Sequence, residues 1–157
     1  MSDALELQTR LVETEDDWAA AQGIRTRVFI EEQACLPEEE WDSYDTAEAR
    51  GTTAHHLLGE ADGQVVATAR WHPVLIAGEP AAKLERFAVL PAARGRGFGR
   101  ALIAHTLADA RAAGFSRFVL HAQAHLDALY ASFGFEQVGD EFEEAGIPHV
   151  KMVLIDP

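Results

Sequence analysis

The sequence predicts a mixed α/β fold, in which helices cover a sheet that is not a strict βαβ repeat. The spacing of its apolar residues gives the order strand, helix, three strands, helix, strand, helix, two strands. Three strands in succession exclude the regular alternation of a doubly wound sheet. The 157 residues, 48% hydrophobic and 25% charged, are enough for a globular core, so we expect a single domain over residues 1–157.

The first third of the chain predicts a strand, a helix and an irregular segment. Residues 5–12 alternate loosely between apolar and polar and indicate the first strand. Thr14, with Asp17 three residues later, is typical of a helix N-terminus, and apolar residues then recur at helical spacing as far as Val28. Residues 36–53 are polar and predict a loop or short helix.

The rest of the chain predicts six strands and two helices. Two apolar runs, residues 56–61 and 64–74, are separated by an Asp-Gly pair, which is a strong hairpin signal. Residues 77–81 mark a turn before a third strand at residues 84–90. A glycine-rich turn then opens a helix that ends at Gly114. The last elements are a strand, a short helix and a strand pair, at residues 118–122, 126–133, 136–142 and 150–155.

Charge is distributed unevenly along the chain. The net charge of −13 argues against a general nucleic-acid-binding protein, because phosphates would be repelled. Residues 86–100 nevertheless contain four arginines and no acid, whereas residues 31–48 contain eight acids and no base. This pattern suggests a specific polyanion site beside a surface that tolerates cations. The alternative is that these charges simply face water.

The N-terminal sequence and the cysteine content indicate a cytoplasmic protein without a membrane partner. No apolar run approaches the roughly 20 residues that cross a bilayer. The first ten residues carry acids where a secretory signal has a basic patch and then an apolar stretch. A lone cysteine, Cys35, cannot form an internal disulfide, which agrees with a reducing compartment.

The strongest chemical signal is the sequence Arg-Gly-Arg-Gly-Phe-Gly-Arg at residues 94–100. Glycines allow a tight turn and a close approach of backbone N–H groups to a ligand. The start of the following helix adds a partial positive charge, and arginines bind phosphate oxygens. The segment therefore predicts a pyrophosphate site, although a glycine-rich helix entry that binds nothing remains the alternative. The Lys-Ser/Thr of a P-loop is absent, which disfavours phosphoryl transfer.

Two segments resemble motifs of the GNAT superfamily of N-acetyltransferases. Residues 89–99 resemble its central motif, R/Q-x-x-G-x-G/A, and residues 129–135 (Leu-Tyr-Ala-Ser-Phe-Gly-Phe) resemble its second motif, in the same order. The resemblance extends over nearly the whole chain to the ElaA-like branch. The segments that carry it are residues 27–29, 32–33, 42, 45, 56–59, 121–125 and 146–149.

The resemblance implies a mainly antiparallel, twisted mixed sheet of about six to seven strands, flanked by helices. It also implies an N-acyltransferase that moves an acetyl or other short acyl group from acyl-CoA to a primary amine of a small molecule, by direct attack on the thioester. Acetyl-CoA would be the co-substrate, and no metal would be needed. Dimers are common on this fold, but no residue here requires a homodimer.

The resemblance further implies roles for individual residues. The backbone of Phe87, Ala88 and Val89 would bond the pantetheine arm like an added strand. Tyr130 would protonate the leaving thiolate, since a phenol with an ordinary pKa near 10 matches that thiolate in basicity; its alternative is a core tyrosine. The pyrophosphate would be held by the turn, which consists of Arg94, Gly95, Arg96, Gly97, Phe98, Gly99 and Arg100.

Glu85 is the candidate base that removes a proton from the amine, with a structural salt bridge as an equally supported alternative. The first helix, the loop after it and the last strands would shape the acceptor pocket. Carboxylates there would attract an ammonium group, so a small cationic amine is expected, unless the loop is merely solvated. The candidate acceptor-binding residues are Glu32, Asp42, Asp45 and His149.

Other functions for these residues have less support. His121 and His125 are four residues apart, but at a strand end and without an obvious third ligand, so no metal site is expected. Acidic neighbours disfavour Cys35 as a nucleophile. A non-catalytic acyl-CoA-binding domain would keep the turn but would not need Tyr130. Residues 27–29, 41–45, 70 and 84–87 also resemble the autoinducer synthases, which use acyl carrier protein, but the intact glycine turn favours free acyl-CoA.

Overall fold

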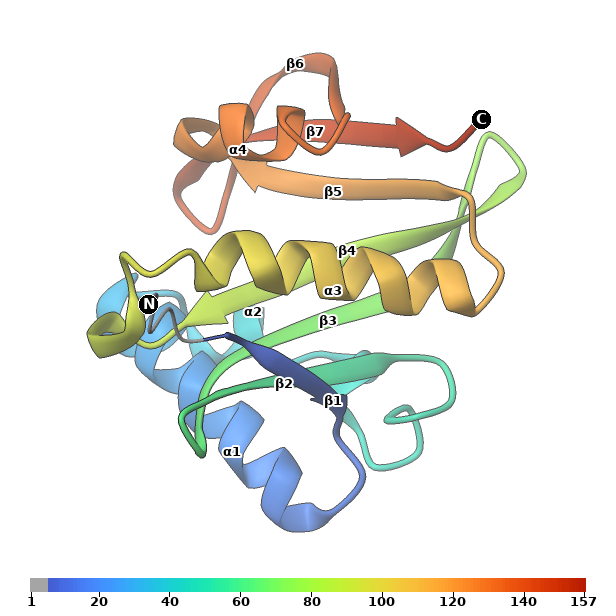
Figure 1. Ribbon diagram of the computed structural model, residues 1–157. Coiled ribbons are helices and arrows are strands. Elements are labelled where there is room, and N and C mark those ends of the chain that lie inside the picture. Colours follow the sequence, from blue (N-terminus) through green and yellow to red (C-terminus); the bar gives the residue numbers. More distant parts are fainter. Residues whose placement is uncertain (1–5) are drawn as a thin grey trace, which may run out of the picture.

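The computed structural model describes residues 6–157, and its centre is one seven-stranded sheet with the order β1-β2-β3-β4-β5-β7-β6 (Figure 1). Neighbouring strands are antiparallel except β4 and β5, which are parallel. The expected fold class is thereby confirmed. The strands are β1 (Gln8–Leu11), β2 (His55–Ala61), β3 (Gln64–Ile76), β4 (Glu79–Val89), β5 (Arg117–Gln123), β6 (Glu136–Glu144) and β7 (Ile147–Ile155).

Helices cover both faces of the sheet. Successive residues of a strand point to opposite faces, and Leu57 of β2 packs in a cluster with α3 and Tyr130, whereas Leu58 packs with α1. Helix α1 therefore covers one face, and α3, which runs along β4 (Figure 1), covers the other. The helical segments are α1 (Glu15–Arg25), the π-helix η1 (Thr26–Glu32), α2 (Pro37–Glu40), η2 (Ser43–Asp45), η3 (Pro91–Ala93), α3 (Phe98–Ala112), η4 (Ala124–Leu126) and α4 (Asp127–Ala131).

The ends of the two long helices follow their local sequence. Thr14 accepts a hydrogen bond from the N–H of Asp17, and the Asp17 side chain accepts from the N–H of Thr14, which is the reciprocal capping expected for α1. Gly114, with a φ of 101°, follows α3, as expected for a helix stop. Of the helices in residues 6–157, none is long and apolar enough to span a membrane.

The third predicted strand begins earlier than the sequence indicated. The turn comprises only Ala77 and Gly78, with φ of 50° and 81°, and pairing resumes at once between Ile76 and Glu79. Two residues with positive φ make a tight hairpin turn, so the strand includes Pro80. The last two strands are also longer than predicted, and of the predicted first strand, Leu5 lies outside the described residues.

Candidate active site

The two parallel strands in the middle of the sheet separate shortly after they meet. β4 and β5 are paired only at Ala82–Phe118 and Lys83–Val119, although both strands continue. On its other side, β4 stays paired with β3 as far as Val89. The part of β4 beyond Lys83 therefore presents an open strand edge toward β5. Such an edge can bond an extended ligand as a further strand.

A β-bulge in β4 lies at this separation. The pairing of β3 with β4 shifts between Thr68 and Arg70, opposite Arg86, which has a φ of 60°. This left-handed conformation is uncommon for a residue with a side chain, and bulges of this kind bend a strand and redirect its side chains. The bulge directly precedes residues 87–89, the predicted pantetheine-binding backbone, and so bends β4 where it leaves β5.

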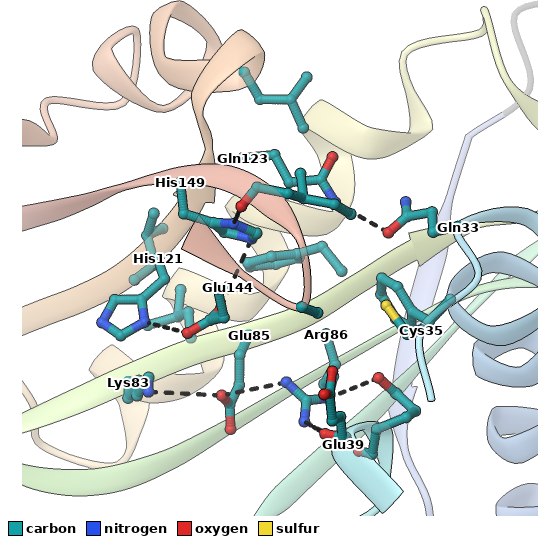
Figure 2. A pocket seen from close by; sticks show the side chains of 18 of the residues that line it. Gln33, Cys35, Glu39, Lys83, Glu85, Arg86, His121, Gln123, Glu144 and His149 are labelled. Carbon is teal, nitrogen blue, oxygen red and sulfur yellow. Dashed lines mark hydrogen bonds and ion pairs between the residues drawn. The ribbon is translucent and has the colours of Figure 1, made fainter. Parts of the chain in front are cut away.

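A cavity of about 190 Å³ opens where β4 and β5 separate (Figure 2). Leu120 and His121 both line it, although neighbouring residues of a strand point to opposite faces, so the cavity reaches through the gap in the sheet. Its apolar end is formed by Phe87, Leu120, Leu126 and Tyr130. Its polar wall includes Lys83, Glu85, Arg86, His121, Gln123, Glu144 and His149.

The glycine turn at residues 94–100 leads into α3 as predicted. Gly95 and Gly97 both have a φ of 81°, and Gly97 precedes the helix without a side-chain cap. The first helical bond runs from the N–H of Ala101 to the Gly97 carbonyl, so the N–H groups of residues 98–100 have no acceptor within the described chain. A Cβ added at any glycine of the turn would meet nothing within 4 Å. Free N–H groups beside open space fit a pyrophosphate.

The arginines of the turn are exposed and differ in their partners. Arg94 donates to both carboxylate oxygens of Glu32, each at 2.6 Å, and these bonds lower the pKa of Glu32. Arg100 donates to Ser132 Oγ at 2.9 Å. Arg96 makes no ion pair within residues 6–157. The acceptor-binding role of Glu32 stays a prediction, and the structure places this residue beside the glycine turn.

Tyr130 lies at the apolar end of the cavity. Only 6% of its surface is exposed, and its ring packs between Phe87 and Phe135 at centroid distances of 6.1 and 6.2 Å. Burial raises the pKa of Tyr130 well above its ordinary value. The hydroxyl group is protonated at neutral pH, but its raised pKa makes it a weaker acid than the phenol of ordinary pKa that was expected to match the thiolate.

Glu85 lies in the polar wall and is held by basic side chains. Its Oε1 accepts from Arg70 and is 2.9 Å from His72 Nε2, and Oε2 is 3.9 Å from Lys83 Nζ and 3.7 Å from Arg86 Nη1. Burial alone would raise the pKa of Glu85, but the hydrogen bond with His72 and the charges of Arg70 and Arg86 hold it well below its usual range. The salt bridge is thus present, whereas the role as base stays a prediction.

Asp42 and Asp45 bind arginines and are absent from the cavity wall. Asp45, whose side chain is 7% exposed, accepts from Arg25 at 2.6 Å and from Arg70 at 2.9 Å. Asp42 accepts from Arg70 at 2.7 and 2.8 Å, and Glu40 accepts from Arg25 at 2.7 Å. We call these residues with Glu85 the ion-pair cluster. The acceptor-binding role of both aspartates stays a prediction, and both carboxylates already have strong donors.

Three side chains from the last strands form a chain along the polar wall. His121 Nδ1 is 2.9 Å from Glu144 Oε1, and Glu144 Oε2 is 3.7 Å from His149 Nε2 (Figure 2). His149, a predicted acceptor residue, thus lines the cavity, although its role is a prediction. In the sequence, His121 belongs to a segment that resembles the family and was a possible metal ligand, but its contact with Glu144 was not predicted. Its position on the strand after the glycine helix was the available signal.

Among the described residues, no group of three or more His, Cys, Asp or Glu side chains could hold a metal ion. His125 does not line the cavity. Cys35 does, but burial and the charges of Glu40 and Glu39 raise the pKa of its thiol, as its acidic neighbours predicted. The candidate catalytic and binding groups are therefore the tyrosine, the polar wall and the glycine turn.

Comparisons with known proteins agree with this geometry. Residues 22–155 match the family model of the acetyltransferase (GNAT) domain. A crystal structure of an acyl-CoA N-acyltransferase from Pseudomonas aeruginosa is 32% identical, with a TM-score of 0.80, over 96% of this chain and 99% of that one. Escherichia coli ElaA is 31% identical, with a TM-score of 0.80, over 96% and 99%. A GNAT family acetyltransferase from Brucella melitensis, in complex with acetyl-CoA, is 27% identical, with a TM-score of 0.68, over 91% and 95%.

The open edge of β4, the glycine turn at the start of α3 and the buried tyrosine are thus found in a chain that aligns with these enzymes over nearly its full length. The superfamily resemblance seen in the sequence is confirmed, and so is the expectation of an enzyme of the acetyltransferase type. The chain belongs to the GNAT acetyltransferase family.

Proposed function

We propose that this enzyme transfers an acetyl or other short acyl group from acyl-CoA to a primary amine of a small molecule. The observation that carries the proposal is the cavity between β4 and β5, because it connects the apolar end at Tyr130 with a polar wall on the other face of the sheet. A donor bound along β4 and an acceptor bound at the polar wall would meet there. Bringing two reactants together in one geometry is itself a large part of catalysis.

The residues proposed to bind acyl-CoA are the ones expected from the sequence. The free N–H groups of the glycine turn and the exposed guanidinium of Arg96 would hold the pyrophosphate. The open edge at Phe87, Ala88 and Val89 would bond the pantetheine amides. Acyl-CoA supplies an activated thioester. A Brucella melitensis relative was crystallised with acetyl-CoA, which supports acetyl as the acyl group.

Tyr130 would act as the acid of the reaction. Its ring lines the cavity next to Phe87, one of the predicted pantetheine-binding residues. Burial raises the pKa of Tyr130, so its Oη carries a proton until a strong base such as a thiolate forms beside it. Tyr130 would give this proton to the departing sulfur.

The test compares wild type with Tyr130→Phe, using acetyl-CoA and an amine panel of putrescine, glucosamine and glycine ethyl ester. We expect thiol release with at least one amine, and a fall in kcat of roughly 100-fold in the variant, the usual size of an acid contribution. The Kd for acetyl-CoA should change less than twofold, because the phenyl ring keeps its packing. Tyr44→Phe is the matched control, since Tyr44 does not line the cavity.

Two results would contradict this account. Equal turnover in wild type and Tyr130→Phe would remove the tyrosine from the chemistry while leaving acyl transfer in place. Acetyl-CoA binding by the wild type without transfer to any amine would contradict the proposed acceptor class.

A further inference from the structure

The polar wall of the cavity contains an imidazole with a fixed orientation. His121, on β5, lines the cavity and has a side chain 27% exposed. Its Nδ1 lies 2.9 Å from Glu144 Oε1 on β6, and Phe142 packs edge-on against its ring at a centroid distance of 5.1 Å. The ring is thus held both by a hydrogen bond and by an aromatic neighbour. Within residues 6–157, Nε2 of His121 makes no hydrogen bond or ion pair.

The contact with Glu144 determines which ring nitrogen carries the proton. The hydrogen bond from His121 lowers the pKa of Glu144 and outweighs the effect of burial, so the carboxylate is ionised at neutral pH. An ionised carboxylate can only accept a hydrogen bond, so Nδ1 of His121 must be the donor. In the neutral ring, Nε2 is then the nitrogen with a free lone pair. His121 is therefore prepared to accept a proton at Nε2.

The other groups of the wall are less suited to this task. Glu85 accepts from Arg70 and His72, which favour its ionised form and make it a weak base. Lys83 and Arg86 are cations. His149 donates Nδ1–H to the Ile147 carbonyl at 2.7 Å, as His121 does to Glu144. Its side chain is less accessible to an acceptor amine, however, because the residue is only 7% exposed.

We propose that His121 is the general base of the reaction, and that Glu144 is a positioning residue that fixes its tautomer. This inference rests on the proposed transfer to an amine. An N–H bond of the bound ammonium breaks, the proton forms a bond with His121 Nε2, and the electron pair stays on the amine nitrogen as the nucleophile. The imidazolium is stabilised by Glu144 and later releases its proton to solvent.

Several titratable or charged side chains surround the His121 ring. Glu144 is in contact with it, and His149 lies on the far side of Glu144. Lys83 and Glu85 of β4 line the same cavity, and Lys151 of β7 lies opposite His121 in the strand register. Among these, only the Glu144 carboxylate makes a hydrogen bond with the ring.

The experiment measures kcat, KM and their pH dependence for acetyl transfer to the best amine of the panel. We expect His121→Ala to lower kcat roughly 100-fold or more, with the KM for acetyl-CoA within about twofold. Glu144→Gln should lower kcat less and move the acidic limb of kcat/KM to lower pH, because a neighbouring carboxylate favours the protonated ring. His125→Ala is the matched control, because His125 is exposed and outside the cavity.

A second measurement does not depend on turnover. In the wild type, ¹⁵N shifts of the His121 ring at pH 8 should report the Nδ1–H tautomer, and Glu144→Ala, which leaves no side-chain acceptor at this position, should lose this preference. An Nε2–H tautomer, or a His121→Ala enzyme within threefold of wild-type kcat, would overturn the inference and leave the proposed function intact. A wild type that transfers no acetyl group to any amine would instead overturn the proposed function, and the role of His121 with it.

Discussion

The protein contains two groups of arginines whose surroundings are opposite. Arg94, Arg96 and Arg100 lie on an exposed turn, where the neighbouring backbone N–H groups have no acceptor in the described chain. Arg25 and Arg70 are each 1% exposed and are surrounded by carboxylates at hydrogen-bond distance. In the first group, Arg94 is paired with exposed Glu32 and Arg100 with Ser132, whereas the Arg96 side chain makes no hydrogen bond or ion pair within residues 6–157 and keeps its donors for a ligand. The donors of the second group are used on carboxylates in the protein interior and nearby.

This difference explains the acidic segment at residues 31–48. Its carboxylates suggested a surface that attracts a cationic acceptor, but the buried Glu40 and Asp45 accept from Arg25 and Arg70, and the more exposed Asp42 also accepts from Arg70. A buried charge without a partner is strongly unfavourable, so each of these groups requires the others. The same residue types are thus available to a ligand where they are exposed and stabilise the fold where they are buried.

The largest expected effect comes from breaking the ion-pair cluster. Arg70→Met removes the donor to Asp42, Asp45 and Glu85, and should lower the free energy of unfolding by about 3–5 kcal/mol, because it leaves buried carboxylates uncompensated. Arg94→Met is the matched control. The ion pair of Arg94 with Glu32 is exposed, so removing it should lower the free energy of unfolding by less than about 1 kcal/mol. Urea denaturation measures both, and similar losses in the two variants would contradict the comparison.

A smaller effect is expected in the pH dependence of the free energy of unfolding. His56 lies against the ion-pair cluster, with Nε2 2.9 Å from the Tyr44 carbonyl and 4.0 Å from Asp45 Oδ1. Burial lowers the pKa of His56 from 6.5 to about 4. Because the unfolded chain then binds a proton more readily than the folded one, stability should fall as the pH decreases from 6.5 to 4, by roughly 3 kcal/mol at most.

The measurement is the free energy of unfolding of wild type and His56→Gln at several pH values. The free energy of unfolding of the wild type, minus that of His56→Gln, should decrease as the pH falls below 6.5. Only the wild type has the histidine whose protonation favours the unfolded chain. A His125→Gln control should follow the wild type, since His125 is exposed. Parallel curves for wild type and His56→Gln would show that this histidine is not held neutral by burial.

Much of the fold could be predicted from local sequence. The hairpin between β2 and β3, the cap at Thr14 and the glycine turn before α3 each depend on residues within a few positions of one another. The start of β4 could not, because Gly78 and Pro80 indicate a turn locally, whereas the pairing with β3 continues almost to the turn. The bulge at Arg86 was also invisible, since nothing in an arginine side chain favours a positive φ.

The candidate site was predictable on its donor side and less so on its acceptor side. The turn and Tyr130 belong to short segments that resemble family motifs. The partners of Asp45, by contrast, are 20 and 25 residues away in sequence, and those of His121 are on another strand. Burial of a charge depends on such distant contacts, so a run of acids looks the same in sequence whether it faces water or an arginine.

The measurement that tests the account most directly is calorimetric titration of acetyl-CoA into wild type and an Arg94→Ala, Arg96→Ala double variant. Arg111→Ala is the control, because Arg111 lies at the other end of α3 and is paired with Asp156. We predict micromolar binding by wild type and control, and affinity at least tenfold lower in the double variant, about 1.4 kcal/mol. Absence of binding by the wild type, or equal affinity in the double variant, would contradict the central claim that the exposed arginine turn holds acyl-CoA.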